Sequence, residues 1–203
     1  MVVEKRYKIL DKQIVYDGFF RMEKYRLQHT LFEGGWSEPM SRELFERGHA
    51  VAVLLYDPRE DAVVMVEQFR IGALECEAGA WFLEVVAGMV EEGESDESVA
   101  RRESDEEAGC QVGRLEFIAR YWVSPGGTSE TLALYCGEVD STAAGGVHGL
   151  DHENEDILVH VVPYSELLEI WQRGEINSAT PLLAVQWLVM NRERIREEWG
   201  DSF

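Results

Sequence analysis

The chain is poor in basic residues, in cysteine and in long apolar runs, and each shortage excludes a class of protein. It holds 19 Lys and Arg against 39 Asp and Glu, a formal net charge of -20, so its surface repels nucleic-acid backbones and anionic lipid. No apolar run approaches the roughly 18 residues of a membrane-spanning helix. We therefore expect no nucleic-acid partner and no membrane partner, and an anionic ligand would need a local positive charge.

The three cysteines, Cys76, Cys110 and Cys136, match neither a CxxC motif nor a zinc-binding pattern. An odd number of widely spaced cysteines is typical of proteins in a reducing compartment. The first ten residues contain no apolar core of a signal peptide. Together these features predict a cytoplasmic location.

The apolar patterns indicate a mixture of strands and helices. Residues 1–46 contain β-prone runs but few bulky aliphatic side chains, so this segment is expected to pack on the rest of the chain or on another subunit. The mixture predicts an α+β fold, with an N-terminal antiparallel β-segment at 1–46 and a main domain at 47–203. The expected strands of the main domain are 50–56, 62–69, 81–86, 115–123, 131–139 and 157–162, and the expected helices are 95–108, 164–173 and 178–196.

The helix expected at 95–108 carries an acidic face. Glu103, Glu106 and Glu107 stand at positions i, i+3 and i+4, so they share one face and repel one another unless a cation offsets their charge. Arg102 is adjacent, but a direct neighbour in sequence is expected to point elsewhere on the helix. Three carboxylates on one face suit Mg²⁺, which prefers oxygen ligands. The alternative is a solvated acidic surface.

The spacing around this helix favours the metal site. From Gly88 the chain reads G-x5-E-x7-R-E-x-x-E-E-x-G and ends at Gly109. This pattern resembles the signature box of the Nudix family. Ser104 and Cys110 differ from the residues usual in the family, but neither stands at a metal-binding position, and a buried cysteine packs as a small hydrophobe. The resemblance implies an α/β/α sandwich on a mixed sheet and the hydrolysis of a nucleoside diphosphate linked to another group.

Two segments after the box resemble the ADP-ribose-hydrolysing branch of that family. Pro125 stands in a Ser-Pro-Gly-Gly run at 124–127, fifteen residues after Cys110, and an acidic run at 153–156 follows a glycine-containing segment. The resemblance implies Mg²⁺-dependent (or Mn²⁺-dependent) hydrolysis of ADP-ribose to AMP and ribose 5-phosphate. It also implies a homodimer that exchanges its N-terminal segments.

The resemblance further implies a role for each matching residue. Glu103, Glu106, Glu107 and the backbone carbonyl of Ala87 would bind the metal. Glu153, in a mobile catalytic loop of the branch, would act as the general base, with Glu155 as its rival. The implied substrate-binding residues are Gly88 in the loop before the helix, Arg42 and Arg70 at the diphosphate, Ser124 and Glu130 at the terminal ribose, and Phe19 stacked on adenine from the other subunit.

Other interpretations stay open at this level. The substrate is either ADP-ribose or another nucleoside diphosphate sugar. A different class is a module that senses ADP-ribose without cleaving it, but the intact box and the acidic loop argue against this, as does the lack of a basic DNA-binding segment. Arg42 and Arg70 have a plain alternative as surface arginines.

Overall fold

The structure is a computed structural model that describes residues 4–150, 152 and 154–200. Its contacts divide the chain into two compact units. The first comprises Met1–His49 with Tyr121–Thr131, and the second comprises Ala50–Arg120 with Leu132–Phe203. Residues 121–131 thus belong to the same compact unit as the N-terminal segment. The division into domains at 1–46 and 47–203 remains a prediction.

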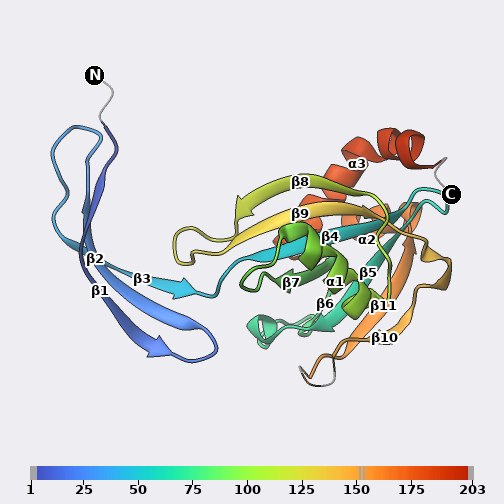
Figure 1. The fold of residues 1–203 in the computed structure, drawn as a ribbon, viewed down its shortest axis with the longest axis horizontal. Helices are drawn as coiled ribbons and strands as arrows, with labels where there is room; N and C mark the ends of the chain where they lie inside the picture. The colour runs from blue at the N-terminus through green and yellow to red at the C-terminus, as the bar shows by residue number, and fades with distance from the viewer. Residues whose placement is uncertain (1–3, 151, 153, 201–203) are drawn as a thin grey trace. The chain divides into compact units, whose positions relative to one another are not determined.

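The first unit is built on a three-stranded antiparallel sheet in the order β1-β2-β3, coloured blue in Figure 1. The strands are β1 (Tyr7–Asp17), β2 (Arg21–His29) and β3 (Met40–Glu46). β1 is one continuous strand of 11 residues. Its register against β2 shifts between Ile9 and Asp11 and again between Ile14 and Tyr16, so the alternation of side chains is broken twice.

The second unit contains a mixed sheet in the order β10-β11-β5-β4-β9-β8, with β6 paired to β5 and β7 paired to β4. β4 and β9 run parallel, whereas the other registered pairs are antiparallel. The strands are β4 (Ala50–Asp57), β5 (Ala62–Phe69), β6 (Trp81–Glu84), β7 (Val86–Met89), β8 (Leu115–Trp122), β9 (Thr131–Glu138), β10 (Gly146–His148) and β11 (Ile157–Pro163).

Three α-helices pack on this sheet: α1 (Asp96–Ala108), α2 (Tyr164–Gln172) and α3 (Ala179–Trp199). α1 packs against β4, β5 and β7, and α3 packs against β4 and β6, so the sheet lies between helices (Figure 1). All eight residues of β4 are buried, as expected for a central strand covered on both faces. Val51, Val53 and Leu55 form a core with Val99 and Ala100 of α1.

The predicted α+β fold with a mixed sheet is confirmed. The sequence placed one strand at 81–86, where the structure has two, because β6 pairs with β5 and β7 pairs with β4 on either side of Val85. Within the described residues, no helix combines the length and apolar character needed to cross a membrane.

Candidate active site

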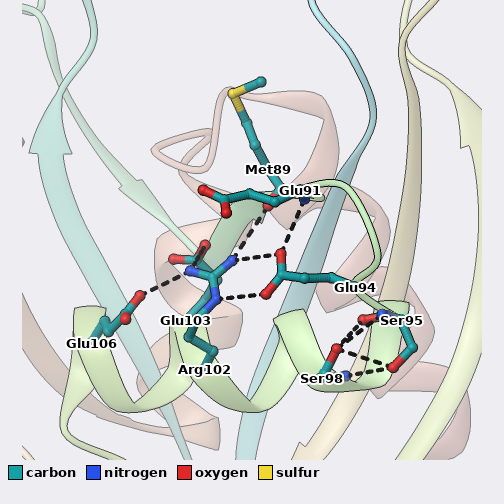
Figure 2. Close-up of polar contacts among 8 residues, drawn as sticks. All are labelled: Met89, Glu91, Glu94, Ser95, Ser98, Arg102, Glu103 and Glu106. Atoms are coloured by element: carbon teal, nitrogen blue, oxygen red, sulfur yellow. Dashed lines mark hydrogen bonds and ion pairs between the residues drawn. The ribbon is translucent and has the colours of Figure 1, made fainter.

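Helix α1 begins and ends where local side chains satisfy its backbone. Ser95 caps the N-terminus: its Oγ accepts from the N–H of Ser98, and the Ser98 Oγ accepts from the N–H of Ser95 (Figure 2). Gly109 ends the helix with a left-handed φ of 62°, which glycine adopts without strain. The predicted limits of the helix are therefore confirmed, and the helix that carries the acidic face is capped at both ends.

Gly88 on β7 lies directly against Glu103 of α1. A Cβ atom built on Gly88 would be 1.7 Å from Oε1 of Glu103 and 1.9 Å from its Cδ. A side chain at residue 88 would have to displace the Glu103 carboxylate from this position, so glycine allows the strand and the glutamate to approach each other. The structure thus gives Gly88 a packing role toward the acidic face, and its predicted contact with substrate stays a prediction.

Glu107 is the most deeply buried of the three glutamates, with 2% of its surface exposed. Its Oε2 accepts a hydrogen bond of 3.0 Å from the backbone N–H of Ala87. Burial, reinforced by the negative charges of Glu103 and Glu155, raises the pKa of Glu107 to about 8. Burial therefore disfavours the charged form of this carboxyl group, and a nearby cation would offset that cost.

Arg102 lies among the glutamates, which corrects the expectation that it points elsewhere. Its Nη1 donates to Oε1 of Glu103 at 2.8 Å and to Oε2 of Glu106 at 3.0 Å. Burial raises the pKa of Glu103, although the neighbouring Arg102 charge opposes this shift. The long, flexible arginine side chain reaches along the helix surface, and the i, i+4 spacing to Glu106 allows an ion pair.

Arg102 also fastens the loop before the helix. Its Nε and Nη2 donate to the two carboxylate oxygens of Glu94, at 3.0 and 3.1 Å (Figure 2). Oε2 of Glu94 accepts in turn from the backbone N–H of Glu91. Hydrogen bonding to Glu94 is the largest of the effects that raise the pKa of Arg102. Arg102 therefore links Glu94, in the loop before the helix, to Glu103 and Glu106 on the acidic face.

Arg70 supplies a positive charge that acts on Glu107. It follows β5, and its Nε donates to Oε2 of Glu84 at 2.7 Å. Its charge lowers the pKa of Glu107, against the larger effect of burial. Glu84 also accepts from the hydroxyl of Ser178 at 3.5 Å, which joins Arg70 to the start of α3.

The acidic run after β10 brings Glu155 into this site. The negative charge of Glu155 raises the pKa of both Glu103 and Glu107, so its carboxylate lies within electrostatic range of the face of α1. Glu153, predicted as the general base, lies outside the described residues. Of the two rival bases, the structure therefore describes only Glu155.

The remaining predicted residues belong to the first unit. Phe19 is 88% exposed at the turn between β1 and β2. Arg42 lies on β3, where its Nη1 donates to the carbonyl of Ser41 at 2.8 Å. Ser124 is exposed, whereas Glu130 is buried and lies 3.5 Å from Nη1 of Arg47. Their roles toward a substrate remain predictions.

The donor set suits a hard cation, although it is not assembled as a metal cage. Within residues 4–150, 152 and 154–200, no group of three or more His, Cys, Asp and Glu side chains has the geometry to hold a metal ion. Arg102 instead bonds to two of the glutamates. Buried Glu107 and half-buried Glu103, with raised pKa values, are oxygen donors whose charge a divalent cation would offset.

Two contributors to the site were missed at the sequence level. Glu84 holds Arg70, but an isolated glutamate on a strand carries no signal that identifies its partner. Arg102 was assigned no contact with the acidic face, although its i, i+4 spacing to Glu106 could have indicated one.

Comparison with known proteins adds three findings. The model of the NUDIX domain matches residues 46–183. Over 193 residues the chain is 47% identical to the "ADP-ribose pyrophosphatase" of Escherichia coli (strain K12), covering 95% of this chain and 92% of that protein. It is 46% identical over 198 residues to the "ADP-ribose pyrophosphatase" of Haemophilus influenzae (strain ATCC 51907 / DSM 11121 / KW20 / Rd), covering 96% and 91%.

A solved structure supports the fold independently. The crystal structure of an "ADP compounds hydrolase" matches with a TM-score of 0.70 over 96% of each chain, at 18% sequence identity. At this identity the likeness concerns the arrangement of the elements, which therefore persists although most side chains differ.

Proposed function

The chain belongs to the Nudix family, and from this premise we propose that it hydrolyses ADP-ribose to AMP and ribose 5-phosphate in the presence of Mg²⁺. The observation that carries the proposal is the acidic face of α1, with Glu103 and Glu107 packed against β7, in a chain that resembles ADP-ribose pyrophosphatases over nearly its whole length.

Nudix hydrolases generally use divalent metal cations, and we propose Mg²⁺ here, with Mn²⁺ as a substitute. Glu103, Glu106, Glu107 and the carbonyl of Ala87 would hold it, since they offer the oxygen ligands that Mg²⁺ prefers. When bound, the metal supplies positive charge that offsets the charge of the diphosphate and lowers the pKa of a water molecule. The buried position of Glu107 supports this assignment.

The arginines would bind the diphosphate. A net charge of -20 repels an anionic substrate, so local cations are needed to attract it. Arg70 is held by Glu84 in the second unit, and Arg42 lies on β3 of the first. Arg70 is the better oriented of the two before substrate binds, because its ion pair fixes one edge of the guanidinium group. Gly88 would allow the diphosphate to approach the backbone of β7.

Glu155 or Glu153 would accept a proton from the attacking water. The water oxygen forms a bond to phosphorus, the bond from that phosphorus to the bridging oxygen breaks, and AMP and ribose 5-phosphate are released. The electrostatic coupling of Glu155 to Glu103 and Glu107 supports its presence beside the reacting groups. Glu153 remains the rival, and separate Gln variants of the two residues identify the base by the larger loss of kcat.

The first unit would recognise the nucleoside. It contains an aromatic pocket of about 420 Å³ that includes Phe19 in its lining. Stacking on an aromatic ring suits a planar base such as adenine. Ser124 and Glu130 would contact the terminal ribose. The lining residues of the pocket are Tyr16, Phe19, Phe20, Arg21, Met22 and Phe45.

We also propose that the protein is a cytoplasmic homodimer. The three cysteines are free, which is consistent with a reducing compartment. All residues of β1 are exposed, including six large apolar or aromatic side chains, and a second copy would cover such a surface. Analytical ultracentrifugation should give twice the chain mass, and deletion of residues 1–46 should abolish the dimer. A full-length monomer at micromolar concentration contradicts this proposal.

The decisive assay compares ADP-ribose with ADP-glucose, GDP-mannose and NADH, with and without Mg²⁺, and detects AMP and ribose 5-phosphate. We expect a Mg²⁺-dependent preference for ADP-ribose. Preference for another nucleotide sugar would retain the metal site and reject the assignment of the substrate. Tight binding of ADP-ribose without hydrolysis of any compound would support a sensor instead.

A further inference from the structure

His148, at the end of β10, rests on the C-terminal end of helix α1. A Cβ atom built on Gly109, the residue that ends this helix, would lie 2.7 Å from Cε1 of the His148 ring. The ring is also held at Nε2, which is 3.0 Å from the carbonyl oxygen of Gly145. The histidine therefore packs directly on the glycine and sets the separation between β10 and α1.

The next residue connects the helix to Glu155. The backbone N–H of Gly149 donates to the carbonyl of Glu106 at 3.3 Å. Gly149 has a φ of +103°, and a Cβ atom there would lie 2.7 Å from Cβ of Glu155. Both the backbone angle and the space thus require glycine, and Glu155 lies directly over it.

Glu155 is held in a short turn above this glycine. Its Oε2 accepts from the N–H of Leu150 at 3.2 Å, and its own N–H donates to the carbonyl of Leu150 at 3.4 Å. Three links therefore connect α1 to the Glu155 side chain. His148 packs on Gly109, Gly149 bonds to Glu106, and Leu150 bonds to Glu155. A shift of β10 relative to α1 would move the carboxylate with it.

We infer that His148 and Gly149 are positioning residues, which seat the carboxylate of Glu155 beside the acidic face of α1. The inference rests on the proposed function, because it assigns Glu155 a part in that reaction. The hydrogen bond from Gly149 to Glu106 and the contact between Gly149 and Glu155 carry it. The His148 ring sets the distance between β10 and α1, and the backbone angle of Gly149 sets the direction in which the chain continues toward Glu155.

The first test is Gly149→Ala with Gly146→Ala as the matched control. Gly146 is in the same segment and also has a positive φ, +90°, but a Cβ atom there meets nothing within 4 Å. Both variants carry backbone strain, whereas only Gly149→Ala displaces Glu155. We expect kcat for ADP-ribose to fall about 10- to 100-fold in Gly149→Ala relative to the control, with KM changed less than about threefold. Equal kcat values in the two variants contradict the inference.

The second test asks whether the effect passes through Glu155. In a Glu155→Gln background, Gly149→Ala should cause little further loss of kcat, because the group that it positions is already absent. A multiplicative loss in the double variant would indicate a general structural role and overturn the inference. His148→Ala should behave in the same way, with His160→Ala as the control histidine from β11.

A third measurement does not depend on turnover. Hydrogen exchange of peptides covering 149–157, on the millisecond timescale, should be faster in Gly149→Ala and His148→Ala than in wild type and in Gly146→Ala. Circular dichroism melts identify any variant that fails to fold. Wild-type protein that does not hydrolyse ADP-ribose contradicts the proposed function, whereas unchanged exchange in both positioning variants contradicts this inference.

Discussion

Strands β1 and β4 belong to the same chain, yet they have opposite environments. All eleven residues of β1 are exposed, whereas all eight residues of β4 are buried. β4 reads as a continuous apolar run up to its last residue, whereas β1 mixes lysine, aspartate and glutamine with isoleucine, leucine, valine and tyrosine. The second unit therefore contains its own hydrophobic core, whereas the first unit leaves the apolar side chains of β1 exposed.

The buried residues of the first unit sharpen this contrast. Within residues 4–49 and 121–131, every buried residue is polar. Glu23 is bonded to Lys12 at 2.9 Å and to the hydroxyl of Tyr25 at 2.7 Å, and both contacts lower its pKa. The buried set is Glu23, Ser37, Thr128, Glu130 and Thr131.

This contrast leads us to expect different functions for the two units. In the second unit, half-buried Glu103 and buried Glu107 have raised pKa values and are suited to binding a cation. In the first unit, the buried Glu23 is already paired with the ammonium group of Lys12. We therefore expect that changes at the acidic site of the second unit mainly alter kcat, and that changes in the first unit mainly alter substrate binding or assembly. A buried group of the second unit away from this site should affect stability instead. Four predictions test this division, from the largest expected effect to the smallest.

Glu107→Gln should lower kcat for ADP-ribose by about 1,000-fold or more, because it removes a proposed metal ligand. The fold should persist, since glutamine keeps the volume and can accept from the N–H of Ala87. Product analysis and circular dichroism melts measure both effects. Glu97→Gln, in the exposed first turn of the same helix, is the control. Turnover near the wild-type value in Glu107→Gln would reject the metal assignment.

Gly88→Ala should lower kcat by about 100-fold. A Cβ atom on residue 88 would lie 1.7 Å from Oε1 of Glu103. The new methyl group would therefore overlap the Glu103 carboxylate and displace it from the site. Gly72→Ala introduces the same methyl group where nothing lies within 4 Å and should retain activity. Isothermal titration calorimetry should also show weaker binding of Mg²⁺ to this variant, because a proposed ligand is displaced. Full activity of Gly88→Ala would mean that the position of Glu103 is not critical.

Phe19→Ala should raise KM for ADP-ribose about tenfold and leave kcat within about twofold, as expected for a lost stacking contact. Phe32→Ala is a close control, because Phe32 is 87% exposed and lies in the same unit. Steady-state kinetics on both variants separate the two effects. A selective loss of kcat in Phe19→Ala would contradict the division between binding and chemistry.

The smallest effect on activity is expected at Asp57, which is fully buried in the second unit. Burial raises the pKa of this carboxyl group, but hydrogen bonds from Ser141, Glu60 and Arg59 outweigh it and leave the pKa below its ordinary value. A carboxyl group with a lowered folded pKa stabilises the protein above its unfolded pKa of about 3.9 and loses this effect as the pH falls through the folded value.

Asp57→Ala should therefore cost about 2–3 kcal/mol of unfolding free energy at pH 7, because buried donors lose their acceptor. Its stability should also fall less steeply than that of wild type when the pH is lowered below about 4. Urea unfolding between pH 3 and pH 7 measures both quantities, and KM and kcat should stay near wild type. Identical pH profiles would show that Asp57 is not the source of the acid sensitivity.

Much of the second unit could be predicted because its signals are local. Helix α1 lies between its caps Ser95 and Gly109. A turn at 58–61 joins β4 to β5 in a hairpin. In the first unit, the bulges in β1 interrupt the alternation on which strand prediction depends, and β3 lacked a clear pattern. The prediction failed where side chains from distant segments meet, as for Glu84 with Arg70.

By itself, the sequence determined the acidic face of α1, its caps and the spacing of the box, because these depend on residues within a few positions of one another. Only the tertiary structure decided that Gly88 lies against Glu103, that Glu107 is buried and bonded to the backbone N–H of Ala87, and that Glu155 packs on Gly149. These features arise from packing between elements far apart in the chain. Burial then sets the pKa values, because the loss of water acts on each carboxylate only in the folded protein.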